Sequence, residues 1–400
     1  MKVLKITLLL LMLFSLMTAI CYGQTAEDYY EKGIEHGIAG KFEKAQQEFQ
    51  KALEADPFYM PATSCLKITK DALEQRIKTQ TALYLFKGIA YANKGVYDEA
   101  IAEYKKAIKI NPNYAEAHSA LGTAYGEKGI YDEAVAEYKK ALEINPNHVM
   151  AHNNLGEAYR RKGMLDQAIT ECKKAIEIDP QFAMAHYNLG LAYHHKGMYD
   201  KAIAHYKKAI EINPNDAEAH YNLGEAYRHK AMYDEAIAHY KKAIEINPND
   251  AEAHSNLGLA YGEKGMYDQE IAEYKKAIEV NPNLAEAHNN LGVAYADKGM
   301  YDEAITEFKK AIEIDPNYAD AHTGLGGAYA NKGMYAKAIA QCKKAIEINP
   351  NHAMAHNNLA VAYYYKGEYS LAIKHCDKAI EVGCRVHPKL LKALKPYREK

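Results

Sequence analysis

Residues 253–284 read AHSNLGLAYGEKGMYDQEIAEYKKAIEVNPNL, and close variants of this text recur along most of the 400-residue chain. A proline near the end of each copy marks the period, because successive copies place it 34 residues further on. A fixed period of this length predicts one supersecondary unit per repeat, with the units stacked along an axis. The marker residues are Pro112, Pro146, Pro180, Pro214, Pro248, Pro282, Pro316 and Pro350.

Each repeat contains two helical patterns joined by a short turn. In the first, a recurrent His is followed by Leu, Gly and Tyr at positions that share one side of a helix, which predicts a buried stripe. A Gly after this helix supplies the left-handed residue that ends it, and Ala231 replaces that Gly once, which predicts a slightly strained turn. The second helix buries Ala, Ile and Tyr and stops at Asn/Asp-Pro. The recurrent histidines, interpreted as packing residues, are His118, His152, His186, His220, His254, His288, His322 and His356.

This pattern resembles the tetratricopeptide-repeat (TPR) family, which has 34 residues per repeat. Leu-Gly and then Tyr occupy the first helix, Ala, Tyr and Ala the second, and Pro closes the repeat. The family pattern has Trp where this chain has His. The resemblance implies an all-α, right-handed superhelix, an α-solenoid whose first helices line a concave groove.

The repeat pattern divides the chain into five segments. Residues 1–23 combine two lysines with an apolar stretch and are interpreted as a secretory signal peptide. Residues 26–59 form a degenerate first repeat, 60–80 a helical insertion, 81–386 nine contiguous repeats, and 387–400 a C-terminal capping helix. The signal predicts a periplasmic or secreted protein, and the alternative is anchoring to the inner membrane by an uncleaved N-terminal segment.

Charge and motif content argue against several classes of function. The chain has 50 Lys plus Arg against 52 Asp plus Glu, far from the basic excess of a nucleic-acid-binding protein. It contains no H-E-x-x-H, C-x-x-C or Gly-rich phosphate loop, so we expect no enzyme, cofactor or metal. Cys172, Cys342 and Cys376 occupy a slot that holds Tyr or Phe in sister repeats, and we interpret them as apolar filler.

An asparagine recurs two residues after the His, about 200° around the helix and thus opposite the buried stripe. A primary amide offers donors and an acceptor together and so matches one peptide unit. The pattern is similar to the asparagine ladder of O-linked N-acetylglucosamine transferases, which implies that these side chains grip a peptide backbone. No stretch of this sequence resembles the catalytic domain of those enzymes. The alternative is a polar residue copied when the repeats duplicated. The ladder comprises Asn154, Asn188, Asn222, Asn256, Asn290 and Asn358.

Three successive repeats place basic side chains beside the ladder, whereas flanking repeats carry Gly-Glu or Ala-Asp at the same offsets. We expect a basic middle of the groove that binds an acidic segment, and the alternative is ordinary solvated charge. A metal site built from the histidines of this set is a further, less favoured alternative. The set comprises Arg160, Arg161, His194, His195, Arg228 and His229.

The sequence therefore predicts a non-catalytic scaffold that binds extended segments of a partner protein in its groove. Two alternatives stay open: an envelope solenoid that associates with itself, and a substrate-binding partner of a separate glycosyltransferase or other modifying enzyme. We expect no nucleic-acid partner and no membrane contact beyond the export signal.

Overall fold

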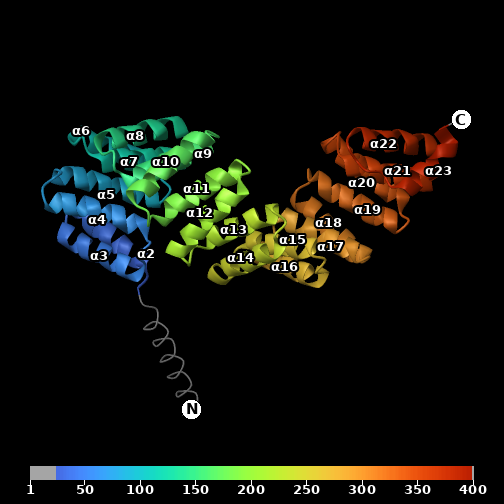
Figure 1. Ribbon diagram of the computed structural model, residues 1–400, viewed down its shortest axis with the longest axis horizontal. Helices are drawn as coiled ribbons and strands as arrows, with labels where there is room; N and C mark the ends of the chain where they lie inside the picture. The colour runs from blue at the N-terminus through green and yellow to red at the C-terminus, as the bar shows by residue number, and fades with distance from the viewer. Residues whose placement is uncertain (1–23, 399–400) are drawn as a thin grey trace, which may run out of the picture. The chain divides into compact units, whose positions relative to one another are not determined.

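The structure is a computed structural model that describes residues 24–398, so the predicted signal peptide lies outside the described residues. Within this range the chain forms 22 helices and no strand. Figure 1 shows them stacked as antiparallel pairs in each of two compact units, one ending at Pro214 and the other beginning at Asn215. The all-α repeat architecture expected from the sequence is confirmed.

Helix bounds follow the repeat pattern closely. In the first unit they are α2 (Ala26–Ile38), α3 (Phe42–Ala55), α4 (Met60–Leu73), α5 (Thr79–Asn93), α6 (Tyr97–Ile110), α7 (Ala115–Glu127), α8 (Tyr131–Ile144), α9 (Val149–Arg161), α10 (Leu165–Ile178), α11 (Ala183–His195) and α12 (Tyr199–Ile212). In the second unit they are α13 (Ala217–His229), α14 (Tyr233–Ile246), α15 (Ala251–Glu263), α16 (Tyr267–Val280), α17 (Ala285–Asp297), α18 (Tyr301–Ile314), α19 (Ala319–Asn331), α20 (Tyr335–Ile348), α21 (Ala353–Tyr365), α22 (Tyr369–Glu381) and α23 (Pro388–Arg398). We call the first helix of each pair leading and the second trailing.

The turn inside each pair depends on one left-handed residue. Gly occupies this position in most repeats, and Ala231 adopts the same conformation with φ of 56°. A Cβ is disfavoured in this region of backbone space. The strained turn predicted at Ala231 is therefore present.

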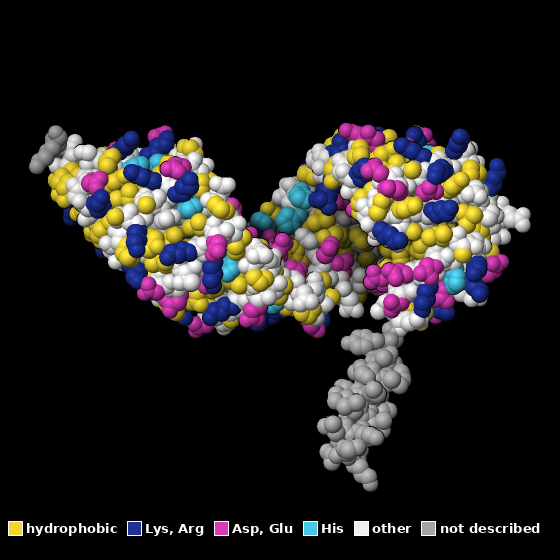
Figure 2. All heavy atoms as spheres, turned by 180° about the vertical axis from the view of Figure 1, so that it is seen from behind, with side chains coloured by type: hydrophobic (Ala, Val, Ile, Leu, Met, Phe, Trp, Pro, Cys, Tyr) yellow, Lys and Arg dark blue, Asp and Glu magenta, His cyan; other side chains and the backbone are white. Residues whose placement is uncertain are grey.

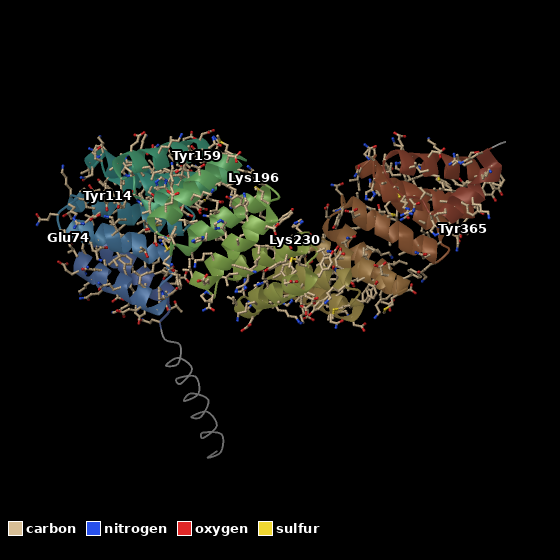
Figure 3. The ribbon with its side chains drawn as sticks, viewed as in Figure 1. Glu74, Tyr114, Tyr159, Lys196, Lys230 and Tyr365 are labelled. Atoms are coloured by element: carbon tan, nitrogen blue, oxygen red, sulfur yellow. The ribbon has the colours of Figure 1, made fainter. Side chains whose placement is uncertain are left out.

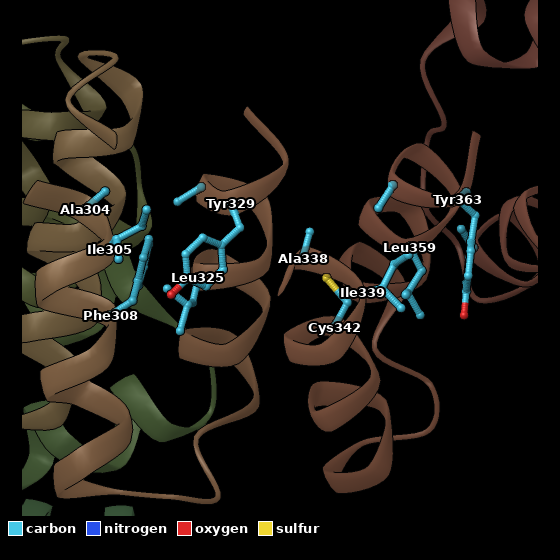
Figure 4. Packing of buried hydrophobic residues seen from close by; sticks show 14 of the residues in the cluster. Ala304, Ile305, Phe308, Leu325, Tyr329, Ala338, Ile339, Cys342, Leu359 and Tyr363 are labelled. Atoms are coloured by element: carbon cyan, nitrogen blue, oxygen red, sulfur yellow. The ribbon is translucent and has the colours of Figure 1, made fainter. Parts of the chain in front are cut away.

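The two helices of a pair approach closely because the leading helix presents a glycine to a large side chain of the trailing helix. A Cβ on Gly190 would lie 2.6 Å from the Tyr206 ring, closer than real contacts allow. Successive pairs then pack through branched and aromatic residues. Figure 4 shows this in the second unit, where Ile305 and Phe308 of α18 face Leu325 of α19.

The recurrent histidines are buried, 4–7% exposed, as a packing role requires. They also make two hydrogen bonds that the sequence reading did not anticipate. The Nε2 atom of His118 donates to the Pro112 carbonyl at 2.9 Å, and its Nδ1 atom donates to Glu137 Oε2 in the trailing helix at 2.6 Å. His118 therefore joins the preceding loop, the leading helix and the trailing helix of its own repeat.

Helix α4 has no partner helix and lies within the predicted 60–80 insertion. It packs on α3, while α5 packs on α2. Its Asp71 is 2% exposed, lies 3.0 Å from both Lys67 and Arg76, and accepts a hydrogen bond of 2.9 Å from Tyr114 Oη. Because Tyr114 caps α7, this carboxylate fixes the end of α4 to a later repeat. Figure 3 labels Glu74, which ends α4, and Tyr114.

Acidic and basic side chains are interspersed over the face of each unit shown in Figure 2. Many form pairs within one helix, such as Lys140 with Glu137 at 2.7 Å. Exposed pairs of this kind add little stability. They keep the surface polar, and neither charge dominates the face that the figure shows.

Candidate functional site

The first unit contains a cavity of about 490 Å³ between α4 and the leading helices α5, α7 and α9. From α7 it is lined by Glu116, Ala120, Thr123 and Glu127, and from α9 by Asn154 among others. These residues occupy the helix offsets opposite the buried histidine stripe. The face that the sequence assigned to a groove is therefore hollowed in this unit, and the insertion helix forms one of its walls.

A second cavity of about 280 Å³ continues from the first. Thr123, Glu127 and Asn154 line both cavities, and Glu157 and Arg161 extend the lining along α9. Together the two cavities form one elongated depression, which we call the α4 trough.

The ladder amides of the first unit differ in exposure. Asn154 is half-buried, and its Nδ2 atom lies 3.4 Å from Thr123 Oγ1. Asn188 is only 6% exposed, and its Nδ2 donates to Asn153 Oδ1 at 2.9 Å. The expectation that every ladder amide faces an open groove is wrong for Asn188, because a buried amide on the preceding leading helix holds its side chain.

The ladder amides of the second unit are half-buried. Asn222 donates to the Glu218 carbonyl at 3.0 Å, and Asn290 accepts from Asn289 at 3.2 Å. Across successive leading helices, Asn256 donates to Tyr221 Oη at 2.7 Å and Asn358 to the Thr323 carbonyl at 3.4 Å. These bonds give the amides a structural role.

The basic residues beside the ladder carry counterions that the sequence reading overlooked. Arg160 binds Glu157 through Nε at 2.7 Å and Nη2 at 2.6 Å, and Arg161 Nε binds the same carboxylate at 2.7 Å. Burial of Glu157 acts in the opposite direction, but these hydrogen bonds hold the pKa of its carboxyl below the usual value. Arg228 is paired likewise with Glu225 at 2.9 Å. The expectation of a strongly basic middle is therefore wrong, because each arginine site includes a glutamate one turn away.

The histidines of this set do not form a metal site. His195 is exposed, and its Nε2 lies 2.9 Å from Arg160 Nη1, while His194 is half-buried beside Tyr199. Both belong to the first unit, and His229, which is exposed, belongs to the second. Among residues 24–398 no three His, Cys, Asp or Glu side chains come together in a way that could hold a metal ion.

The three cysteines in the aromatic slot are buried, at most 1% exposed. Burial raises the pKa of the Cys172 and Cys342 thiols to about 12, so both stay protonated. Across the described part of the chain the cysteines are free thiols. Their position agrees with the filler role expected from the sequence.

Family models match the repeats directly. The model described as TPR repeat matches residues 88–129, 127–163, 156–197, 232–265, 263–299 and 294–333. Models described as tetratricopeptide repeat match 26–59, 183–216, 205–238, 319–352 and 353–382. The chain therefore belongs to the tetratricopeptide-repeat family.

The chain is also similar to solved structures and to a curated protein. The structure titled APC/C hetero-tetramer Cut9-Hcn1 shares the fold, with a TM-score of 0.51 and 18% identity, and the match covers 84% of this chain and 76% of that one. YrrB, titled a TPR protein with an unusual peptide-binding site, is 29% identical with a TM-score of 0.41, over 46% of this chain and 95% of that one. Uncharacterized protein MJ0572 of Methanocaldococcus jannaschii is 54% identical over 37 residues, 9% of this chain, and the chain spans only 43% of that relative.

Between residues 24 and 398 no helix is both long enough and apolar enough to cross a bilayer.

Proposed function

We propose that this protein is a non-catalytic scaffold that binds an extended segment of a partner protein, and that the α4 trough is its principal binding site. The observation that carries the proposal is the trough itself. Side chains from α4, α5, α7 and α9 line two connected cavities, and Asn154 lines both. Cavities of about 300–1,000 Å³ with a few polar groups are typical of binding sites.

Among the ladder amides, Asn154 is the one that contributes to peptide binding in the trough. Asn154 lies at the join of the two cavities, where a peptide lying in the trough passes within reach of its side chain. This is the role implied by the similarity to the asparagine ladder of O-linked N-acetylglucosamine transferases. Each amide bond to a guest contributes about 0.5–1.5 kcal/mol net. Binding through amides alone is therefore loose and tolerant of sequence.

A preference for acidic peptide segments would depend on fewer unpaired positive charges in the groove than the sequence predicted. Glu157 offsets one of its two arginines, so one positive charge remains at Arg160 and Arg161. Arg161 is exposed and lines the second cavity, which makes it the residue that an acidic side chain of the guest would meet. Arg228 and Glu225 cancel.

The site of action proposed here is the periplasm or the extracellular space, which rests on the character of residues 1–23. Antibody detection of the full-length gene product in periplasmic and membrane fractions tests this proposal. Recovery with the membrane after a high-salt wash supports the anchored alternative, and recovery in the cytoplasm contradicts both.

The binding function is tested by co-purification from the native host, followed by titration of the recovered partner against wild type and Asn154→Ala. We expect the dissociation constant to rise about three- to tenfold, since one amide contributes about 0.5–1.5 kcal/mol. Asn222→Ala, in the other unit, is the matched control and should change binding less. A Kd that is the same for all three proteins would remove the α4 trough from the function. Recovery of the chain as a large self-assembly without a partner would favour the structural alternative.

A further inference from the structure

The cavity beside α4 has an apolar floor. Met60 and Ile68 of α4, Ile89 of α5 and Met150 of α9 contribute to it, together with the ring of Tyr104. Burial raises the pKa of the Tyr104 phenol, so the ring carries no charge there. A surface of this composition favours a bulky hydrocarbon or aromatic group over a polar one.

Helix α4 gives the cavity its closed side. Ser64 of α4 contacts Met150 Sδ of α9 at 3.2 Å, although 86 residues separate them in sequence. Lys67 of α4 reaches Glu116 of α7 at 3.3 Å. These contacts hold α4 beside the leading helices, where a regular run of repeats has no such helix.

One buried hydrogen-bond donor in this cavity lacks an acceptor. His148 caps α9, and its Nδ1 atom accepts from the Ala151 N–H at 3.3 Å, so Nε2 carries the proton. Burial lowers the pKa of His148, which keeps the ring neutral. The Nε2 atom is buried and has no hydrogen-bond partner among the described residues. Leaving such a donor unsatisfied is unfavourable, because the group has lost its hydrogen bonds to water.

The sister repeat at α21 shows what satisfies this donor elsewhere. His352 caps α21 in the same way, accepting from the Ala355 N–H at 3.4 Å. Its Nε2 atom donates to Asp320 Oδ1 of the preceding leading helix at 2.9 Å. The residue that corresponds to Asp320 beside His148 is Glu116, and Lys67 of α4 binds it instead. The insertion helix therefore engages the residue that corresponds to this acceptor and leaves the His148 donor for a ligand.

One carboxylate of the trough forms no direct ion pair among the described residues, although Arg161, which lines the same cavity, interacts with it electrostatically. Glu116 is paired with Lys67, and Glu157 with two arginines. Glu127 is exposed, lines both cavities, and forms no ion pair within residues 24–398. A cation beside the apolar group of a ligand would complement this charge.

On the basis of the proposed function, we propose that the α4 trough selects peptides in which a bulky apolar residue lies within three positions of a lysine or arginine. The apolar side chain fills the cavity beside α4, a backbone carbonyl of the same segment accepts from His148 Nε2, and the basic side chain lies against Glu127. The ladder amides bind a peptide backbone with little sequence preference. The insertion helix thereby adds a sequence preference to the groove.

The test begins with a displayed library of random 12-residue peptides, selected against residues 24–400. We expect enriched peptides to carry Leu, Ile, Met or an aromatic residue within three positions of Lys or Arg. One such peptide, made synthetically, is then titrated against wild type and three variants. Enrichment of peptides without this pattern overturns the proposal.

The variants separate the three contacts. Thr63→Trp, at an exposed position of α4 that lines the cavity, should fill it and weaken binding at least tenfold. Glu127→Lys should reverse the preference for a basic residue. His148→Asn retains a capping side chain and should weaken binding about three- to tenfold. Thr63→Ser is the matched control, and circular dichroism and melting temperature show that each variant is folded.

The outcomes distinguish this proposal from the broader one. If peptides bind, and Asn154→Ala weakens them while Thr63→Trp, Glu127→Lys and His148→Asn do not, the binding function stands and the selection rule fails. If no peptide is enriched over a library screened without the protein, both proposals fail. Loss of binding in Thr63→Trp with unchanged helicity supports the rule.

Discussion

Two kinds of repeat differ at one position opposite the recurrent histidine. In the first kind the trailing helix carries Glu, and His288 lies 2.6 Å from Glu307 and 3.2 Å from the Pro282 carbonyl, so both ring nitrogens donate. In the second kind the trailing helix carries His, and His356 Nδ1 lies 2.9 Å from His375 Nδ1 with the rings stacked. Only one of those two nitrogens can donate, so the ring that accepts must be neutral.

The difference shows that one scaffold supports opposite protonation states at equivalent positions. A hydrogen bond to Glu137 raises the pKa of His118, whereas burial and the neighbouring imidazole lower the pKa of His205 and His375 to about 4. The repeat of His118 is therefore stabilised by a proton on that histidine, whereas the repeats of His205 and His375 are destabilised by a proton on theirs.

The largest effect is expected when the histidine itself is removed from a repeat of the first kind. His288→Ala leaves the Pro282 carbonyl and Glu307 without their partner and opens a cavity, which should cost about 2–4 kcal/mol. Hydrogen exchange of α17 and urea denaturation measure this loss. The exposed Glu286→Ala in the same helix is the control, and equal losses in both variants would contradict a linking role for the histidine.

A smaller effect is expected on acidification, which should change the stability of the two kinds of repeat in opposite directions. The lowered pKa of His205 means that its contribution is complete above the unfolded value near 6.5 and is lost as pH falls toward 4. The raised pKa of His118 has the opposite effect: its contribution is complete below 6.5 and is lost as pH rises through the folded value. After allowance for solvent screening, we expect about 1–2 kcal/mol for the pair of His186 and His205.

The measurement is hydrogen exchange of individual helices at pH 7 and pH 5. Protection of α11 and α12 should fall relative to α7 and α8 on acidification. His205→Glu converts one repeat to the first kind and should abolish this fall. If His205→Glu loses protection in acid as wild type does, the paired imidazoles are not the cause.

The smallest effect is expected when the Glu that pairs with a recurrent histidine is made neutral and the hydrogen bond between the two side chains is kept. The chain already contains such a repeat, because His322 Nδ1 donates to Gln341 Oε1 at 2.8 Å. Glu273→Gln should therefore cost no more than about 0.5–1 kcal/mol in urea denaturation, the difference between a charged and a neutral hydrogen bond. Glu273→Leu, which removes the acceptor, should cost more, and an equal cost would show that the hydrogen bond itself contributes nothing.

Much of the fold could be predicted because the sequence repeats itself. The spacing of His, Leu, Gly and Tyr placed the leading helices, and Asn/Asp-Pro placed the ends of the trailing ones. The histidine partners were also present in the sequence as Glu, Gln or His 19 residues further on. They were missed because helical periodicity describes one helix at a time and gives no contact between two.

The site was harder to predict because it depends on departures from the repeat. Residues 60–80 have no sister copy from which their packing could be read, so nothing in the sequence placed α4 beside α7 and α9. The angle around the helix placed Asn154 at a cavity but could not show that Asn153 would hold Asn188. The arginines stood out as charge, while Glu157 was overlooked because its effect depends on side-chain conformation.

Helix α4 also affects how the first unit comes apart. A stack of repeats normally frays from its end, since each repeat contacts only its neighbours. Here Asp71 accepts a hydrogen bond from Tyr114 at the start of α7 and Ser64 contacts α9, so α4 links two segments that are distant from it in sequence. The N-terminal repeats should consequently open together as a single cooperative block, with one common rate of exchange across α4, α7 and α9, whereas the opposite end can unravel one pair at a time.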